Sequence, residues 1–217
     1  MQHHPSAAER VYADLRSRLF GGALAPGRID IQRLAERLSL SQTPVREALA
    51  RLAAEQLLEF TPRIGYAVPR IHADGLRDLY VWNGQLAHLA LGGVVQPQRL
   101  ADDDPRTAHW RLYRHTAEGL YAAEVSALFF EIAISQHNTQ LSDKLSQSND
   151  RLFAARLSEL ESMPSAAEQF ALLLAAWRTS DFSTLAAKID AHHEARIACA
   201  TEIARRASSR QSQKPFP

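Results

Sequence analysis

The nine residues from Ser41 onward carry the side chains that are best placed for recognition chemistry, and they read SQTPVREAL. Apolar residues at positions 45, 48, 49 and 52 recur at i, i+3, i+4 and i+7, which predicts one apolar face of a helix. The opposite face carries Gln42, Thr43 and Arg46. An arginine can form two hydrogen bonds with guanine, and a glutamine can do the same with adenine. These residues therefore indicate the reading of nucleic-acid bases.

The start of this helix also suits a phosphate group. Ser41 or Thr43 can cap the first backbone amides, and Pro44 is tolerated there because first-turn N–H groups have no helical partner. Uncapped amides at a helix N-terminus bind anions, so a DNA phosphate can be held beside the base-reading side chains.

The elements around this segment predict a winged helix-turn-helix. A helix is expected over residues 8–20, a second over 31–38, a turn over 39–41, and the base-reading helix to about residue 55. Residues 57–61 and 66–68 then predict a β-hairpin with its turn at 62–65. Helix-turn-helix geometry places the start of the second helix of the motif in the major groove. A winged helix that binds protein through a solvated polar face fits the same pattern.

Composition narrows the class of protein. The chain has 217 residues, 46% hydrophobic and 23% charged, with a net charge of +1. Residues 1–71 hold ten arginines and no lysine against seven acidic residues, so this segment is basic, a weak sign of nucleic-acid contact. The single cysteine, Cys199, excludes a disulfide framework and a cysteine metal cluster. No apolar run approaches the roughly 18 residues of a membrane span, and the N-terminus has no signal-peptide pattern, so we expect a cytoplasmic protein without membrane contact.

Four stretches resemble the DNA-binding domain of the GntR family of bacterial transcription regulators. They are LAPG at 24–27, LAERL at 34–38, SQTPVREAL at 41–49 and PRIGYAV at 62–68. The resemblance implies that Arg46 and the turn from Ser41 to Thr43 contact DNA, and that Arg63 and Gly65 form the wing tip that approaches the minor groove. Two positions depart from the pattern. Gln42 stands where most relatives carry a second arginine, which alters base preference, and Gln56 replaces the usual glycine before the wing.

The remainder of the chain resembles the FadR-type branch of that family, whose effector domain (FCD domain) is an antiparallel helical bundle. We expect a mainly α protein with a winged helix-turn-helix domain at 1–71, an all-helical effector-binding and dimerisation domain at 72–207, and a disordered tail at 208–217. Helices are expected at 73–95, 106–121, 122–137, 139–160, 164–178 and 181–207. The resemblance implies a homodimer on a short inverted repeat of double-stranded DNA, controlled by a small metabolite.

Many members of that branch bind a divalent metal through an aspartate and three histidines. Alignment of the segments places Val125, Phe129, Phe170 and His192 at these four positions, and of these side chains His192 alone has a donor atom. One imidazole does not hold a divalent ion, so we expect no metal and no cofactor. The two aromatic rings then fill the cavity, or it takes a more apolar ligand. His192 is either a core histidine bonded to a neighbour or a polar anchor for the effector.

Other side chains of the helical part are relevant to effector binding and to enzymatic activity. His88, Arg111, Arg114 and His115 are candidates to meet an anionic effector, although charges on helix faces are more often solvated. Paired carboxylates at helical spacing would favour an enzyme, but Glu159 and Glu161 are two residues apart and do not face one another. We therefore expect no enzymatic activity. The alternative to a regulator is a protein-interaction module whose helical part only dimerises.

Overall fold

The computed structural model describes residues 5–94, 96–101 and 103–212, which divide into two compact units. One unit runs to Arg70 and takes in the chain from Ser208 onward, and the other extends from Ile71 to Ala207. None of the described helices combines the length and apolar content that crossing a membrane requires.

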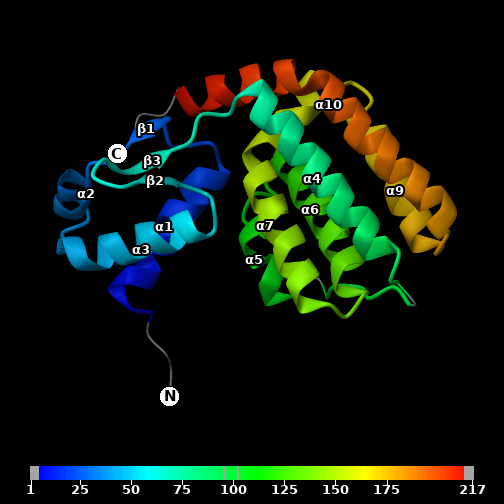
Figure 1. Ribbon diagram of the computed structural model, residues 1–217, viewed down its shortest axis with the longest axis horizontal. Coiled ribbons are helices and arrows are strands. Elements are labelled where there is room, and N and C mark those ends of the chain that lie inside the picture. Colours follow the sequence, from blue (N-terminus) through cyan, green and yellow to red (C-terminus); the bar gives the residue numbers. More distant parts are fainter. Residues whose placement is uncertain (1–4, 95, 102, 213–217) are drawn as a thin grey trace. The chain divides into compact units, whose positions relative to one another are not determined.

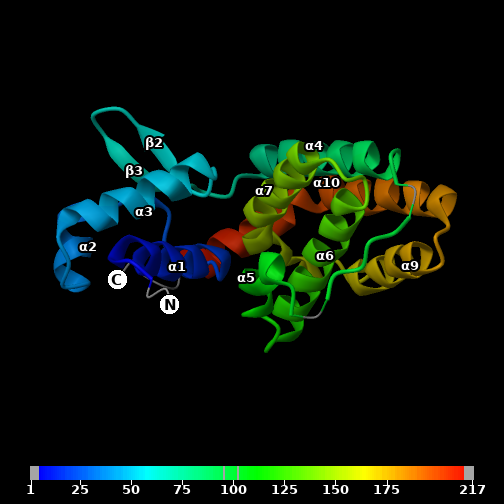
Figure 2. The same cartoon turned by 90° about the horizontal axis from the view of Figure 1, so that it is seen from below.

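The first unit is a winged helix-turn-helix (Figure 1). Its elements are α1 (Ala7–Phe20), β1 (Gly27–Arg28), α2 (Ile31–Arg37), α3 (Gln42–Ala54), β2 (Glu59–Thr61) and β3 (Gly65–Val68). The apolar face predicted for α3 is buried, and α1 packs along this helix through Leu15 and its neighbours. In Figure 2 the hairpin of β2 and β3 extends beyond α3. The expected fold class, a winged helix-turn-helix before a helical domain, is confirmed.

The sheet contains one strand that the sequence analysis missed. The strand order is β1-β3-β2, with all pairs antiparallel, and Gly27 pairs with Val68 while Arg28 pairs with Ala67. Pro26 and Gly27 are residues typical of a turn, and no expected strand covers them. Two residues are too few for a periodic pattern, so pairing with β3 is the only signal that reveals β1.

In two turns of the first unit, a residue other than glycine has a left-handed backbone conformation. Ser39 between α2 and α3 has φ 54°, and Gln56 after α3 has φ 59°. Glycine adopts this conformation at lower cost than other residues. Gln56 thus adopts a backbone conformation that favours glycine, although it carries a side chain.

The second unit consists of helices. Its elements are α4 (Ala73–Leu91), η1 (Pro105–Thr107), α5 (Ala108–Arg111), α6 (Ala117–Ile134), α7 (Thr139–Arg156), α8 (Glu159–Ser162), α9 (Ala166–Arg178) and most of α10 (Phe182–Ser212). Helices α4, α6 and α7 lie side by side in Figures 1 and 2, and they share the apolar core with α9 and α10.

The expected helix at 106–121 is wrong, and two local causes account for it. The Thr116 side chain accepts a hydrogen bond from the Gly119 amide, which starts α6 five residues earlier than expected. A Cβ on Gly119 would lie 1.9 Å from the carbonyl oxygen of Tyr113, so only glycine permits this close approach. The expected helix at 139–160 is also divided, since α7 ends at Arg156 and α8 begins at Glu159.

Helix α10 continues beyond the predicted boundary. The expectation of a disordered tail from Ser208 is wrong for residues 208–212, which are helical, while 213–217 lie outside the described residues. Gln211 is buried, and a Cβ on Gly22 would lie 3.9 Å from the Cβ of Arg210. The polar composition of this segment concealed the fact that its helix packs within the first unit.

Candidate nucleic-acid interface and the polar core

The start of α3 leaves polar groups exposed. Ser41 is the N-cap residue, but its side chain makes no capping hydrogen bond, contrary to the role considered for it. Gln42, Thr43 and Arg46 are exposed, whereas Val45 is fully buried. The first-turn amides of α3 therefore lack a side-chain cap and can donate hydrogen bonds to a phosphate oxygen.

A groove of about 700 Å³ runs between the start of α2, the start of α3 and the wing. Its lining residues are Arg28, Ile29, Asp30, Ile31, Gln32, Gln42, Arg46, Phe60, Arg63, Ile64 and Gly65. Four of the six residues predicted to contact DNA thus line one groove, namely Gln42, Arg46, Arg63 and Gly65.

The wing tip is shaped by its backbone. Arg63 has φ 67° and Gly65 has φ 103°, so positive-φ residues stand on either side of Ile64 at the wing tip. No atom lies within 4 Å of a Cβ built on Gly65, so glycine is required there by conformation and not by space. Phe60 and Ile64 are more than half exposed and add an apolar surface beside Arg63.

Gln42 and Arg46 hydrogen-bond to each other across one turn of α3. The Nη2 group of Arg46 donates to Oε1 of Gln42 at 3.1 Å. This hydrogen bond uses one of the two lone pairs of the Gln42 oxygen, while the remaining N–H groups of both side chains are donors. The pair therefore has more donors than acceptors to offer to base edges.

The second unit contains buried polar side chains that we call the polar core. Its members are Tyr80, Asn83, Tyr121, Ser126, Ser148, Asn149, Arg156, Glu159, Gln169, His192, His193 and Arg196. They come from six helices, α4 and α6 to α10. Buried polar groups are costly unless hydrogen-bonded, so their partners decide what the domain can do.

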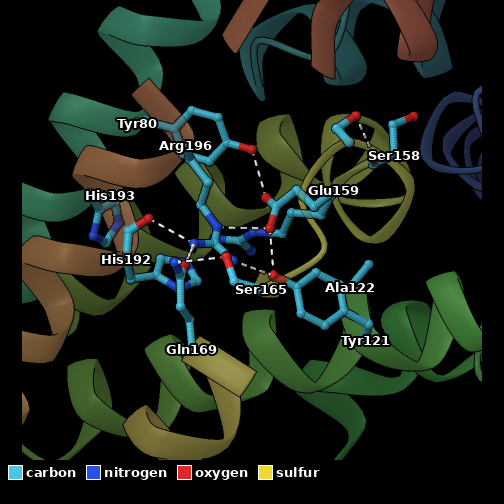
Figure 3. Close-up of polar contacts among 12 residues, drawn as sticks. Tyr80, Tyr121, Ala122, Ser158, Glu159, Ser165, Gln169, His192, His193 and Arg196 are labelled. Carbon is cyan, nitrogen blue, oxygen red and sulfur yellow. Dashed lines mark hydrogen bonds and ion pairs between the residues drawn. The ribbon is translucent and has the colours of Figure 1, made fainter. Parts of the chain in front are cut away.

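Glu159 is the hub of one half of the polar core (Figure 3). Its Oε1 accepts a hydrogen bond from the Tyr80 hydroxyl at 2.6 Å, and its Oε2 accepts from the Tyr121 hydroxyl at 2.5 Å and from Arg196 Nε at 2.7 Å. The side chains of Glu159 and Arg196 are both 0% exposed. Arg196 Nη1 also donates to Gln169 Oε1 at 2.9 Å and to the backbone carbonyl of His192 at 2.7 Å.

Electrostatics keeps Glu159 ionised and the histidines neutral. Burial alone would raise the pKa of Glu159, but Arg196, Arg156 and the tyrosine hydroxyls hold that pKa below its usual 4.5. Burial lowers the pKa of His193 to about 4, with Arg196 and Arg156 also disfavouring the charged ring. Burial and the same two guanidinium groups hold the pKa of His192 well below 6.5.

Three of the four positions of the family's metal site carry apolar side chains that lie in or against the apolar core. Val125 and Phe129 are fully buried on α6, and the Phe129 ring lies 5.4 Å from the His192 ring. Phe170 is half-buried and meets Tyr121 edge to face at 5.9 Å. Neither ring nitrogen of His192 has a hydrogen-bond partner among the described residues, so His192 is not the bonded core histidine that was one of the two expectations.

These residues do not fit a metal ion. Three of the four side chains have no donor atom, and within the described ranges no group of three or more histidine, cysteine or acidic residues is arranged to hold one. Hydrogen-bonded neighbours orient metal ligands but do not replace them.

The remaining effector candidates have local partners elsewhere. Nε2 of His88 lies 2.6 Å from Oδ1 of Asp190, near the surface. Arg111 donates to the carbonyl of Asp104, and Arg114 forms an ion pair with Glu124. His115 is exposed, and its Nδ1 lies 3.0 Å from the carbonyl oxygen of Leu112. The structure therefore does not bring His88, Arg111, Arg114 or His115 into the polar core.

Sequence reasoning missed Arg196 although a signal was present. Apolar residues at 185, 189, 199 and 203, together with His192, mark the buried stripe of α10, and Arg196 falls on the same stripe. A charged residue on an otherwise apolar stripe is informative because buried charges need partners. The sequence analysis compared Glu159 only with Glu161 as a possible carboxylate pair. Its hydrogen-bond partners Tyr80, Tyr121 and Arg196 lie 79, 38 and 37 residues away in the chain.

Glu159→Gln should destabilise the helical unit strongly, because it leaves the buried Arg196 without its counter-ion. We expect the free energy of unfolding to fall by about 3–5 kcal/mol, measured by urea unfolding followed by far-ultraviolet circular dichroism. Glu202 offers a matched control, since its carboxylate also pairs with arginines but at the surface. Equal urea concentrations at the unfolding midpoints of Glu159→Gln and Glu202→Gln would contradict the role assigned to Glu159.

The same pair predicts a pH dependence. A carboxylate whose folded pKa is depressed below 4.5 stabilises the fold above that pH, and the contribution is lost as the pH falls through the folded pKa. Between about pH 5 and about pH 3, the stability of the parent should therefore fall more steeply than that of Glu159→Gln. Parallel curves for the two proteins would show that folding does not lower the pKa of Glu159.

Comparison with known proteins agrees with this architecture. Residues 7–68 match the model of the family described as bacterial regulatory proteins, gntR family. The chain is 37% identical over 103 residues to the HTH-type transcriptional regulator McbR of Escherichia coli K12, which covers 46% of this chain and 47% of McbR. It thus matches about half the length of that relative. An uncharacterized HTH-type transcriptional regulator, YdhC of Bacillus subtilis 168, is 25% identical over 155 residues, covering 67% of this chain and 68% of YdhC.

Two solved structures share the fold over nearly the whole chain. E. coli McbR/YncC aligns with a TM-score of 0.59 at 24% identity, covering 92% of this chain and 99% of the other. A putative transcriptional regulator GntR from Rhodococcus sp. RHA1 aligns with a TM-score of 0.66 at 18% identity, covering 90% of this chain and 98% of the other. Residues 7–68 therefore form a helix-turn-helix domain of the gntR family of bacterial regulatory proteins, and a helical domain follows them in the chain.

Proposed function

We propose that this protein is a cytoplasmic transcription regulator that binds double-stranded DNA as a homodimer and responds to a small molecule held by its helical unit. The observation that carries the proposal is the groove between α3 and the wing, where exposed donor side chains gather on a domain of the gntR family. Two relatives are named as transcriptional regulators, and we propose no enzymatic activity for this protein.

The groove has the chemistry that DNA requires. Arg46 at the start of α3 is placed to meet base edges, and Arg63 at the wing tip and Arg28 on β1 are placed to meet phosphates. Contacts to phosphate position the protein, whereas contacts to bases select the sequence. A winged helix that bound protein instead would not show an affinity for DNA that falls steeply with salt.

The direct test is selection of genomic DNA fragments by the purified protein, followed by titration of the selected site. Arg46→Ala should weaken binding to that site by about 1–3 kcal/mol, because a two-bond contact with a base is lost. Arg10→Ala is the matched control. It removes the same charge from the same unit, but Arg10 lies on α1 and does not line the groove. Equal losses for both variants, or no selection of any fragment, would contradict the proposal and favour the protein-interaction alternative.

The hydrogen bond between Gln42 and Arg46 predicts the base preference. Because the pair presents donors, the selected half-sites should carry adjacent acceptors such as guanine N7 and O6 facing the start of α3. Gln42→Met should relax the preference at one base pair, as seen by repeating the selection with the variant. Adenine selected opposite Gln42 in the parent would contradict this prediction, because the Gln42 oxygen would then take part in base recognition as an acceptor.

A homodimer is proposed because helix-turn-helix proteins read two half-sites with two-fold symmetry. Helix α4 offers a surface for a second copy of this chain. Trp82 and Leu89 are seven residues apart on one face of α4, with Val81 beside Trp82, and these side chains are 42–62% exposed. Apolar side chains grouped on one helix face are typical of an interface.

Leu89→Arg should therefore give a monomer, because it places a charge in the proposed interface. Leu172→Arg is the control, since Leu172 is also an exposed leucine of the helical unit but lies on α9. Light scattering at micromolar concentration distinguishes the two states. A dimer in Leu89→Arg would locate the interface elsewhere, and a monomeric parent would remove the proposed dimer.

A further inference from the structure

The wing, which is the hairpin of β2 and β3, exposes two large apolar side chains that we call the apolar pair. Phe60 is 57% exposed and Ile64 is 55% exposed, whereas the other large apolar side chains of the described first unit are buried or half-buried. Both members of the pair line the groove beside α3, and the hairpin that carries them extends beyond that helix (Figure 2). Exposed apolar side chains that are grouped in a groove mark a binding surface.

The hairpin gives the apolar pair a stiff support. Phe60 lies opposite Tyr66 in the register of β2 and β3, and the centroids of their rings are 5.0 Å apart. The carbonyl oxygen of Tyr66 accepts a hydrogen bond from the Ile29 amide at 2.8 Å, which ties β3 to the segment after β1. Cross-strand aromatic pairs stabilise a sheet, and a side chain held by a rigid element loses little entropy when it binds.

The turn at the wing tip fixes the position of Ile64. Its amide donates to the carbonyl oxygen of Thr61 at 3.1 Å, which closes a four-residue turn. Pro62 occupies the second position, where its fixed φ suits a turn, and Arg63 occupies the third with φ 67°. An arginine is unfavourable at positive φ, and such conformations persist where surrounding structure holds them, often at binding sites. The turn therefore places Ile64 at the tip, directly after a cation.

The charge around the apolar pair favours DNA over an apolar partner. Three arginines line the groove with it, namely Arg28, Arg46 and Arg63. Among the described lining residues the one acidic side chain is that of Asp30, and it accepts a hydrogen bond from the Arg33 amide. A wholly apolar protein surface would bury the guanidinium groups without counter-ions, which is costly. The minor groove of DNA suits both components, because phosphates border it and apolar side chains can insert between its base steps.

The side chain at the tip, isoleucine, is among those that proteins insert between base pairs from the minor groove, where the wedge unstacks one step and kinks the duplex. We propose that Ile64 is such a wedge, with Phe60 behind it and Arg63 on an adjacent phosphate. The inference rests on the proposed binding of DNA in this groove and adds a residue that determines specificity. Pyrimidine–purine steps, TA and CA/TG, are the most easily unstacked. The operator should therefore carry such a step below the wing, where selection depends on the ease of kinking and not on hydrogen bonds to base edges.

The test uses the full-length protein and the genomic DNA fragment that it selects. 2-Aminopurine, whose fluorescence rises when its stacking is lost, replaces each adenine of either strand of the site in turn. Fluorescence should rise on binding at an adenine of a pyrimidine–purine step in each half-site. Energy transfer between dyes at the two ends of the duplex should report a bend of about 20° or more.

Substitutions at the tip distinguish a wedge from a phosphate contact. Ile64→Ser removes the apolar side chain from an exposed position and should abolish the rise in fluorescence and reduce the bend, whereas Ile64→Leu should keep both. Ile64→Ser should leave the dependence of affinity on salt unchanged, because no phosphate contact is lost. Arg63→Ala should instead lower the slope of log affinity against log salt concentration by about one. Leu172→Ser, at an exposed leucine of α9 outside the groove, is the control and should change neither signal.

Repeating the DNA selection with Ile64→Ser gives a second readout. The preference for a pyrimidine–purine step below the wing should be lost, while the bases that face α3 stay the same. Equal fluorescence and bending for Ile64→Ser and the parent, or an unchanged preference, would overturn the wedge while selection of DNA and its dependence on Arg46 still supported a regulator. Selection of no fragment by the parent would overturn the proposed function itself, and the wedge with it.

Discussion

The ion pair between Arg196 and Glu159 is the interaction on which the helical unit depends. Neither charge has access to water, so each is tolerated only because the other is held within hydrogen-bond distance. The two tyrosines and Gln169 extend the pair to α4, α6 and α9. Apolar residues of a core can be repacked when their total volume is kept, but a shared carboxylate requires each helix to keep its register. The polar core therefore specifies the arrangement of the bundle in a way that its apolar residues alone do not.

The winged-helix unit depends on a different constraint, which is the exposure of its polar side chains. Its apolar residues are buried on the face of α3 opposite to Arg46, so the helix is held without using any side chain that lines the groove. Ser39 and Arg63 adopt left-handed conformations that are unfavourable for residues other than glycine. Such positions persist only where surrounding structure holds them, and here they lie in the turn that leads into α3 and at the wing tip.

The sequence predicted the first unit well because its signals are local. The apolar stripe of α3, the capping region at Ser41 and the hairpin turn at 62–65 each extend over a few residues, and the family pattern covers the same stretch. For the helical unit, the sequence predicted most of the helices. The errors concern contacts between residues for which no sequence pattern indicates a contact. Thr116 and Gly119 begin α6 through one hydrogen bond and one close approach. Glu159 and Arg196 could not be paired from the sequence, because the fold alone brings residues 37 positions apart together.

Helix α10 has a consequence for the order in which the chain acquires its structure. Its residues to Ala207 pack in the helical unit, whereas the turn from Ser208 belongs with the winged helix, so the first unit is discontinuous in sequence. During synthesis the ribosome releases this turn after the whole of the helical unit. Domains generally fold as units as they emerge, with the N-terminal one first. Here the N-terminal unit lacks a packed segment until translation has passed residue 212, so it cannot be completed before the chain of the helical unit has been synthesised.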